Sequence, residues 1–205
     1  KGICYCKRKQ PQVCAKEICQ KQRIADITGK TKGDVSMQLN SSVNIVDKAN
    51  KLVKKIGSRD PEEIAEQSGI YIMPVPFAKQ KGVYKVIERN RFIFIKEDLC
   101  PEMRKIVLLH EIGHDTLHRG EAKMFQEFNI FDMKNNRMEY EANSFAAEIA
   151  LPDEEILEYI HQSYDIEMIA KCMKSDINLV ALKVANFNRR GFDFRLQDSK
   201  SNFLK

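Results

Sequence analysis

Three of the chain's four histidines are spaced four residues apart, at His110, His114 and His118. The first two belong to the pentapeptide HEIGH, which has the form H-E-x-x-H with Glu111 beside the first histidine. Residues four apart lie on one face of a helix, so both imidazoles can reach one ion, and two neutral imidazoles at that spacing suit zinc. The adjacent carboxylate can take a proton from a zinc-bound water molecule. The spacing therefore predicts a catalytic zinc site with His110 and His114 as ligands and Glu111 as the general base.

A catalytic zinc ion usually has three protein ligands and one water, so one more ligand is needed. The remaining histidine, His161, lies in the surface-like stretch EYIHQSYD and fits the role poorly. The segment RMEYEANSFAAEIALP, residues 137–152, is strongly helical and carries Glu139, Glu141 and Glu148. Glu139 and Glu141 point about 200° apart on a helix, so only one of them can face the histidine helix. The alanine and aliphatic positions of the segment favour the face of Glu141, which is the predicted third ligand.

Patterns before and around HEIGH indicate the elements that position it. Apolar spacing and capping residues predict one helix over residues 45–57 and a second over 60–69. β-Branched and aromatic runs predict a strand at IYIMPV and a hairpin of VYKVI and RFIFIK joined by the turn ERN. A long helix is expected over residues 101–119, with Gly120 as its stop signal. These patterns predict an α+β protein in which a small sheet precedes the zinc helix.

The two helical segments together resemble the ImmA/IrrE family of zinc metallopeptidases. The resemblance rests on HEIGHDTLH, the later EYEANSFAAEIALP and the GVYK and RNRFIFI hairpin, and it spans about residues 43–205. It implies a compact, minimal gluzincin-like fold, Zn2+ as the cofactor, and the glutamate of E-A-N, Glu141, as the third ligand. Members of this family occur in phages, mobile elements and stress-response systems. The resemblance therefore implies an endopeptidase that cleaves a protein partner, often a helix-turn-helix repressor encoded nearby.

The implied reaction is zinc-assisted hydrolysis of a peptide bond. Glu111 would accept a proton from the attacking water and pass it to the leaving amine, while zinc polarises the scissile carbonyl. We expect the substrate to lie extended along the edge of the hairpin at residues 83–96. Tyr84, Tyr140 and His118 are candidate oxyanion donors, and His118 could instead hydrogen-bond a zinc ligand. Packing roles for the two tyrosines and a helix-end role for His118 are the alternatives.

The first 42 residues differ in composition from the rest of the chain. Residues 1–32 carry nine basic side chains against two acidic ones, whereas residues 33–205 hold 25 basic and 27 acidic side chains. Four of the six cysteines also lie in the basic segment: Cys4, Cys6, Cys14 and Cys19. They could hold a structural zinc ion or remain free thiols, since their spacing is not a standard one.

The same segment supports a second hypothesis, a DNA-binding transcriptional regulator. The stretch IADITGKTKGDVSMQLN, residues 24–40, resembles a repressor helix-turn-helix. Its positive charge would suit DNA contact through residues 1–40, and a basic flexible extension is the alternative. A third hypothesis is a zinc-binding protein that docks a partner without cleaving it.

The last third of the chain is predicted to be helical. Apolar spacing between residues 165 and 191 indicates two helices around the turn KSDIN, in a helix-turn-helix-like arrangement. Because charge is balanced here, closing the core and docking a protein substrate are favoured over reading DNA. The predicted organisation is a basic segment over 1–42, a peptidase domain over 43–155 and this helical region over 156–205. The longest apolar runs, IVLL and FIFI, are far shorter than the roughly 20 residues that cross a bilayer, so we expect a cytoplasmic protein with no membrane contact.

Overall fold

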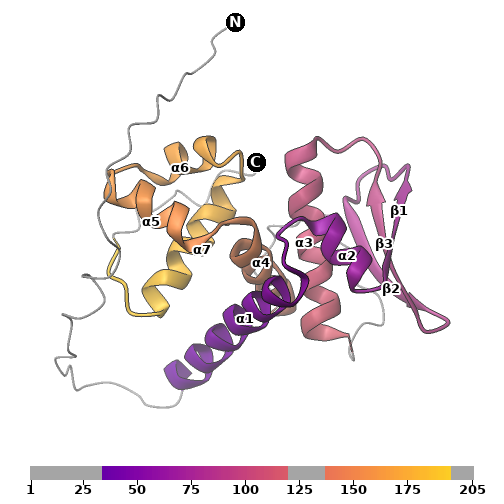
Figure 1. Ribbon diagram of the computed structural model, residues 1–205, viewed down its shortest axis with the longest axis horizontal. Coiled ribbons are helices and arrows are strands. Elements are labelled where there is room, and N and C mark those ends of the chain that lie inside the picture. The colour runs from indigo at the N-terminus through magenta and orange to yellow at the C-terminus, as the bar shows by residue number, and fades with distance from the viewer. Residues whose placement is uncertain (1–33, 120–136, 195–205) are drawn as a thin grey trace, which may run out of the picture. The chain divides into compact units, whose positions relative to one another are not determined.

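The computed structural model describes residues 34–119 and 137–194, with side chains from residue 44 onward, and this part of the chain forms an α+β fold (Figure 1). Its helices are α1 (Asp34–Ile56), α2 (Pro61–Gln67), α3 (Pro101–His118), α4 (Arg137–Ala150), α5 (Asp153–His161), α6 (Ile166–Cys172) and α7 (Ile177–Arg189). Its strands are β1 (Ile70–Val75), β2 (Gly82–Ile87) and β3 (Asn90–Lys96). None of the described helices combines the length and apolar character needed to span a membrane. The α+β class predicted from the sequence is confirmed.

The strand and the hairpin are formed where the sequence predicts them, and the sheet has the order β1-β3-β2. β3 pairs in parallel with β1 and antiparallel with β2, and the hairpin closes on the two residues Glu88 and Arg89. The Lys96 N–H donates to the Lys81 carbonyl at 2.9 Å. Because hydrogen-bonded and non-bonded pairs alternate along an antiparallel ladder, the backbone groups of Gly82 point away from β3. Within the described residues β2 is thus an edge strand whose backbone groups at every second residue are unpaired.

The two faces of the sheet have different surroundings. Tyr84, Ile93 and Ile95 are fully buried on the face that packs against the helices. Figure 1 shows α2 and α3 on this side of the sheet, and α3 contacts both β2 and β3. The alternate residues, such as Phe92 and Phe94, point to the opposite face. The sheet therefore supports α3 with one face and presents an apolar second face.

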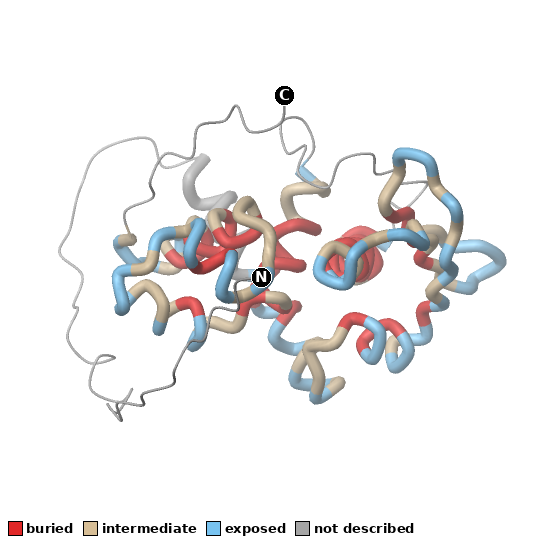
Figure 2. Tube along the Cα trace, turned by 90° about the horizontal axis from the view of Figure 1, so that it is seen from above, coloured by how far each residue is buried: buried red, intermediate tan, exposed pale blue. Residues whose placement is uncertain are grey.

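α3 is the central helix of the core and packs most extensively against α4. Figure 2, seen from above, shows α3 nearly end-on and coloured as buried, and its residues from Ile106 to Asp115 are all buried. A Cβ atom added to Gly113 would lie 3.2 Å from the Cα atom of Ala142 on α4. Glycine at this position lets the two helix backbones approach closely. The contact fixes which side of α4 faces the histidines.

α1 is longer at its start than the sequence pattern predicts. The helix begins at Asp34, whereas apolar spacing predicts a start at residue 45. The intervening DVSMQLNSSVN is polar but contains no glycine or proline, so nothing in it stops a helix. α1 consequently runs across the predicted boundary between residues 42 and 43. The four cysteines and residues 24–33 of the hypothesised DNA-binding motif lie outside the described residues.

The C-terminal helices close the core, as one of the sequence interpretations expects. α6 and α7 flank the KSDIN turn, and α7 packs along α4 with Leu179, Val180 and Phe187 buried. Lys183 of α7 is also buried, and it forms ion pairs with Glu148 of α4 and with Asp153 of α5. Because its apolar face is covered in this way, α7 acts as a core helix that braces α4.

Candidate metal centre

His110 and His114 lie one turn apart on α3 and present their imidazoles to a common point. Both side chains are fully buried, and their Nε2 atoms are 3.0 Å apart. The rings meet edge to face, with centroids 4.7 Å apart. Helix periodicity alone produces this arrangement, as the HEIGH spacing predicts.

The carboxylate that completes the cluster belongs to Glu139 of α4. Its oxygens lie 3.3 Å from Nε2 of His110 and 3.5 Å from Nε2 of His114. These three residues form a group in which one donor atom from each lies within 4.8 Å of the others. The predicted third ligand, Glu141, is not part of that group.

Glu141 instead lies between two basic side chains. One of its oxygens is 2.9 Å from Nε2 of His118, and the other accepts a hydrogen bond from Nε of Arg137 at 2.7 Å. The alanine and aliphatic positions of the sequence favour the face of Glu141, but such residues surround most of α4. The face that meets α3 is marked by Ala142, which packs on Gly113.

The sequence signal that identifies the ligand face is a polar residue. Asn143 is fully buried and lies one turn beyond Glu139, on the same face of α4. A buried asparagine needs hydrogen-bond partners, so it points to a polar site rather than to an apolar core. The pair Glu139 and Asn143, four residues apart, therefore identifies the ligand face more directly than the alanines do.

Hydrogen bonds to the far sides of the rings set the tautomers of both histidines. The Nδ1–H of His110 donates to Oδ1 of Asn143 at 3.0 Å, which leaves the Nε2 lone pair for a metal ion. Nδ1 of His114 lies 3.4 Å from Nδ1 of His118. With His114 donating there, Nε2 of His118 donates to Glu141. His118 and Glu141 thus hold the ring of His114 by hydrogen bonds and are not themselves in the group of candidate metal ligands.

The donor set fits zinc in chemistry and in spacing. Nitrogen and oxygen ligands at about 2.0–2.1 Å from a tetrahedral zinc ion are separated from one another by about 3.3 Å. In the structure the two Nε2 atoms are 3.0 Å apart, one oxygen of Glu139 lies 3.3 Å from Nε2 of His110, and its other oxygen lies 3.5 Å from Nε2 of His114. Two neutral imidazoles and one carboxylate are also the donor types of catalytic zinc sites. The residues present are therefore suited to hold a divalent metal such as zinc.

Glu111 lies beside the metal ligands and directly beneath the first residue of β2. Its side chain is 1% exposed. A Cβ atom built on Gly82 would lie 2.6 Å from Oε1 of Glu111 and 2.6 Å from Cγ1 of Val107. Only glycine fits between the strand and the carboxylate at this distance. The catalytic glutamate predicted from HEIGH is thus placed next to the free edge of β2.

Tyr84, a predicted oxyanion donor, uses its hydroxyl group in a hydrogen bond to Asp115. Its hydroxyl is buried and donates to Oδ1 of Asp115 at 2.6 Å. Burial, together with this hydrogen bond, raises the pKa of Tyr84 well above its ordinary value. Asp115 also accepts hydrogen bonds from Arg91 of β3 and from Arg119 at the end of α3. Tyr84 therefore ties the sheet to α3 in a buried polar network, which is the packing alternative.

Tyr140, the other tyrosine considered, turns toward α7. The guanidinium of Arg189 lies over its ring, 5.1 Å from the centroid. This cation–π contact helps to hold α4 against α7. Of its neighbours in the sequence, Glu139 points toward His110 and His114, and Glu141 points toward His118.

The similarity of the chain to known proteins agrees with this geometry. Residues 65–174, more than half of the chain, match the model of a peptidase family described as the IrrE N-terminal-like domain. An uncharacterized immunity region protein of Bacillus phage phi105 is 33% identical over 122 residues, covering 58% of this chain and 76% of the relative. The metallopeptidase ImmA of Bacillus subtilis strain 168 is 29% identical over 135 residues, covering 63% of this chain and 78% of that protein. The matched region contains the whole His110, His114 and Glu139 cluster, and the chain belongs to this peptidase family, as HEIGHDTLH and EYEANSFAAEIALP predict.

Proposed function

We propose that the chain is a zinc-dependent endopeptidase that cleaves a protein partner, namely a helix-turn-helix repressor of the phage or mobile-element type. The observation that carries this proposal is the cluster of His110, His114 and Glu139, with Glu111 beside it under an edge strand. Membership of the peptidase family supports hydrolysis of peptide bonds. The identity of the metal as zinc rests on the donor types and their separations.

The catalytic work of the chain's own residues follows from their positions. A divalent metal supplies Lewis acidity at such a site, because it polarises a carbonyl group and lowers the pKa of water. Glu111 holds the proton taken from the attacking water and delivers it to the leaving amine. Asn143 keeps the His110 ring in the tautomer that presents Nε2, and α4 carries both Asn143 and Glu139. The α3–α4 contact at Gly113 therefore sets the geometry of the whole centre.

The free edge of β2 is the place where an extended substrate would bind. The backbone groups of Gly82 and Tyr84 point outward from this edge and can pair with a peptide as an added strand. Gly82 is also the residue that lies against Glu111. A strand paired there would pass close to the general base. Because the pairing uses backbone groups, it would not depend on the side chains of the substrate.

A repressor as the substrate follows from the family resemblance, and it fits a relative that is named as a protein of a phage immunity region. The experiment uses the repressor encoded beside the gene for this chain. Purified zinc-loaded protein is expected to cleave it, and Glu111→Gln is expected to retain zinc but lose cleavage by at least about 100-fold.

Glu102→Gln is the matched control, since Glu102 is an exposed glutamate in the first turn of the same helix. It should cleave as the wild type does. Equal cleavage by Glu111→Gln and the wild type would contradict the mechanism. A Glu111→Gln protein and a wild type that bind the repressor equally and leave it intact would favour the non-catalytic docking hypothesis.

A further inference from the structure

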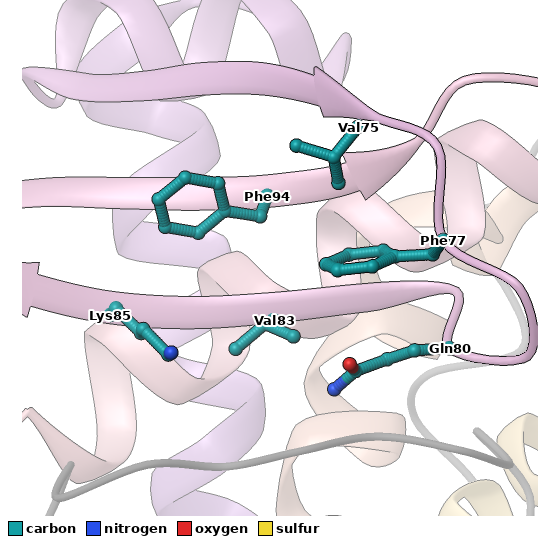
Figure 3. Close-up of a pocket in the computed structure, with 6 residues that line it drawn as sticks. All are labelled: Val75, Phe77, Gln80, Val83, Lys85 and Phe94. Atoms are coloured by element: carbon teal, nitrogen blue, oxygen red, sulfur yellow. The ribbon is translucent and has the colours of Figure 1, made fainter.

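The outer face of the sheet, opposite α3, contains an apolar pocket of about 330 Å³. Its lining is shown in Figure 3 and consists of Val75, Phe77, Gln80, Val83, Lys85 and Phe94. All three strands contribute to it, and two residues come from the connection between β1 and β2. The pocket is distinct from the metal centre, which lies on the other side of the sheet.

The pocket belongs to a larger apolar surface on this face. The rings of Tyr71 and Phe92 stack at 5.4 Å, and those of Phe92 and Phe94 stack at 6.0 Å. Tyr71 and Met73 are 57% and 45% exposed. Contiguous exposed apolar side chains of this kind mark binding surfaces.

Basic and amide groups border the pocket, and none of the described residues that line it is acidic. Figure 3 shows the side-chain nitrogens of Gln80 and Lys85 ending on either side of Val83. The Nε2 atom of Gln80 is buried and has no hydrogen-bond partner within the described part of the chain. Lys79 and Lys81 add two further positive charges in the connection that leads into β2. Within the described residues none of these three lysines takes part in an ion pair. The pocket thus offers an apolar floor with hydrogen-bond donors and positive charge at its edge.

The pocket adjoins the edge at which a substrate strand would pair. Side chains alternate between the two faces of a sheet, so every second residue of an added strand would lie on the outer face. Residues directly opposite Val83 or Lys85 would have their Cβ atoms about 4.5–5.5 Å from those of β2. The remaining residues would face Glu111 and the metal ligands. One bound strand can therefore contact both the reacting centre and this pocket.

We propose that the pocket selects the substrate, by taking an apolar side chain of the bound strand while acidic side chains two positions away, on the same face of that strand, meet Lys85 and Gln80. This proposal rests on the proposed endopeptidase function and names its substrate class: a protein segment with an apolar residue and with aspartate or glutamate two positions before or after it. The apolar side chain gains burial against Val83 and Phe94. The acidic neighbours gain an ion pair with Lys85 and a hydrogen bond from Gln80.

The test compares cleavage preferences by using a proteome-derived peptide library digested by zinc-loaded protein and read by mass spectrometry. Aligned cleavage sites are expected to show, at a fixed distance from the cut, an apolar residue with an acidic residue two positions away. Two synthetic peptides that differ only in carrying glutamate or lysine two positions from the apolar residue then give the ratio of kcat/KM. Charge reversal in Lys85→Glu should lower that ratio by about tenfold or more, because an attraction is replaced by a repulsion. The wild-type ratio should also fall as salt is raised.

Lys51→Glu is the matched control, because Lys51 is an exposed lysine on α1 and the change in net charge is the same. It should leave the ratio unchanged. Cleavage by the wild type without the apolar and acidic preference would overturn the pocket proposal while leaving the endopeptidase intact. An equal effect of Lys51→Glu and Lys85→Glu would also overturn it, since bulk charge would then explain the result.

A binding selection separates failure of the pocket from failure of the endopeptidase. Peptides displayed on phage are selected against immobilised, zinc-loaded Glu111→Gln protein. Enrichment of apolar residues with an acidic residue two positions away, lost in the Lys85→Glu background, supports the pocket even if the wild type cleaves nothing. Enrichment of unrelated sequences contradicts it.

Discussion

Replacing Gly82 by alanine tests the placement of the general base under β2. The new Cβ atom would lie 2.6 Å from Oε1 of Glu111 and from Cγ1 of Val107, and 3.2 Å from Cγ of Glu111. An ordinary contact needs about 3.4 Å, so the strand and the Glu111 side chain must separate by about 0.8 Å. The Val107 contact blocks the simplest escape, because moving only the carboxylate does not relieve it. Both the strand edge and the general base are therefore expected to shift.

The expected result is a loss of activity larger than the loss of stability. A misplacement of about 1 Å at a catalytic group costs about 100-fold in rate. Overpacking at a buried contact lowers the free energy of unfolding by about 1–3 kcal/mol. The assay measures kcat/KM on a cleaved peptide, the zinc content and the urea midpoint of the same preparations. Zinc content should stay at the wild-type level, because the substitution touches no metal ligand.

Gly57→Ala is the control for a general loss of stability. Gly57 has a φ of +80°, and no atom of a described residue outside its own chain neighbours lies within 4 Å of an added Cβ, so alanine there strains the backbone without a clash. It should cost about 1 kcal/mol of stability and leave kcat/KM unchanged. Wild-type kcat/KM in Gly82→Ala would refute the placement of Glu111 against β2.

Three further substitutions test two ion pairs and the hairpin turn between β2 and β3. Lys183→Met should lower the free energy of unfolding by about 3–5 kcal/mol in urea titrations, because it leaves the buried carboxylate of Glu148 without its main partner. A loss below about 1 kcal/mol would show that this ion pair is not desolvated. Arg89→Gly should raise the urea midpoint by an amount worth up to about 1 kcal/mol, because Arg89 has a φ of 68° in a two-residue hairpin. An unchanged midpoint would mean that the turn relaxes in solution. Burial raises the pKa of Asp153, but hydrogen bonds from Arg190 and Lys183 outweigh it and hold the pKa below the ordinary 3.8. The depressed pKa contributes stability that is present above about pH 4 and is lost as the pH falls through the folded value. The difference in Tm between the wild type and Asp153→Asn should therefore shrink in acid below pH 4, and a constant difference would contradict this assignment.

Features set by local sequence were predictable, and the histidine pair is the clearest case. A spacing of four on a helix places His110 and His114 on one face whatever surrounds the helix. The hairpin is similar, since two β-branched runs separated by a short polar turn have few other arrangements. In contrast, the parallel pairing of β1 with β3 depends on the path of residues 76–81, which carry the chain from β1 to β2 and leave β3 between these two strands, and no local pattern describes that path.

The third ligand depends on how one helix is rotated against another. That rotation follows from a contact between Gly113 and Ala142, far apart in the sequence, and from the buried Asn143. Alanines occur on several sides of α4, so their positions do not show whether Glu139 or Glu141 faces α3. A buried polar residue four positions from a glutamate is the more reliable guide.

Zinc content in Glu139→Gln and Glu141→Gln tests the assignment of the metal centre most directly. Both changes remove one carboxylate charge from the same helix, two residues apart. Glu139→Gln should purify with little zinc, because it removes a donor from the cluster. Glu141→Gln should still bind one zinc ion per chain, with affinity lowered by about 10–100-fold, because its carboxylate supports His118 and is two hydrogen bonds removed from the ion. Full zinc in Glu139→Gln together with its loss in Glu141→Gln would contradict the centre described for this chain.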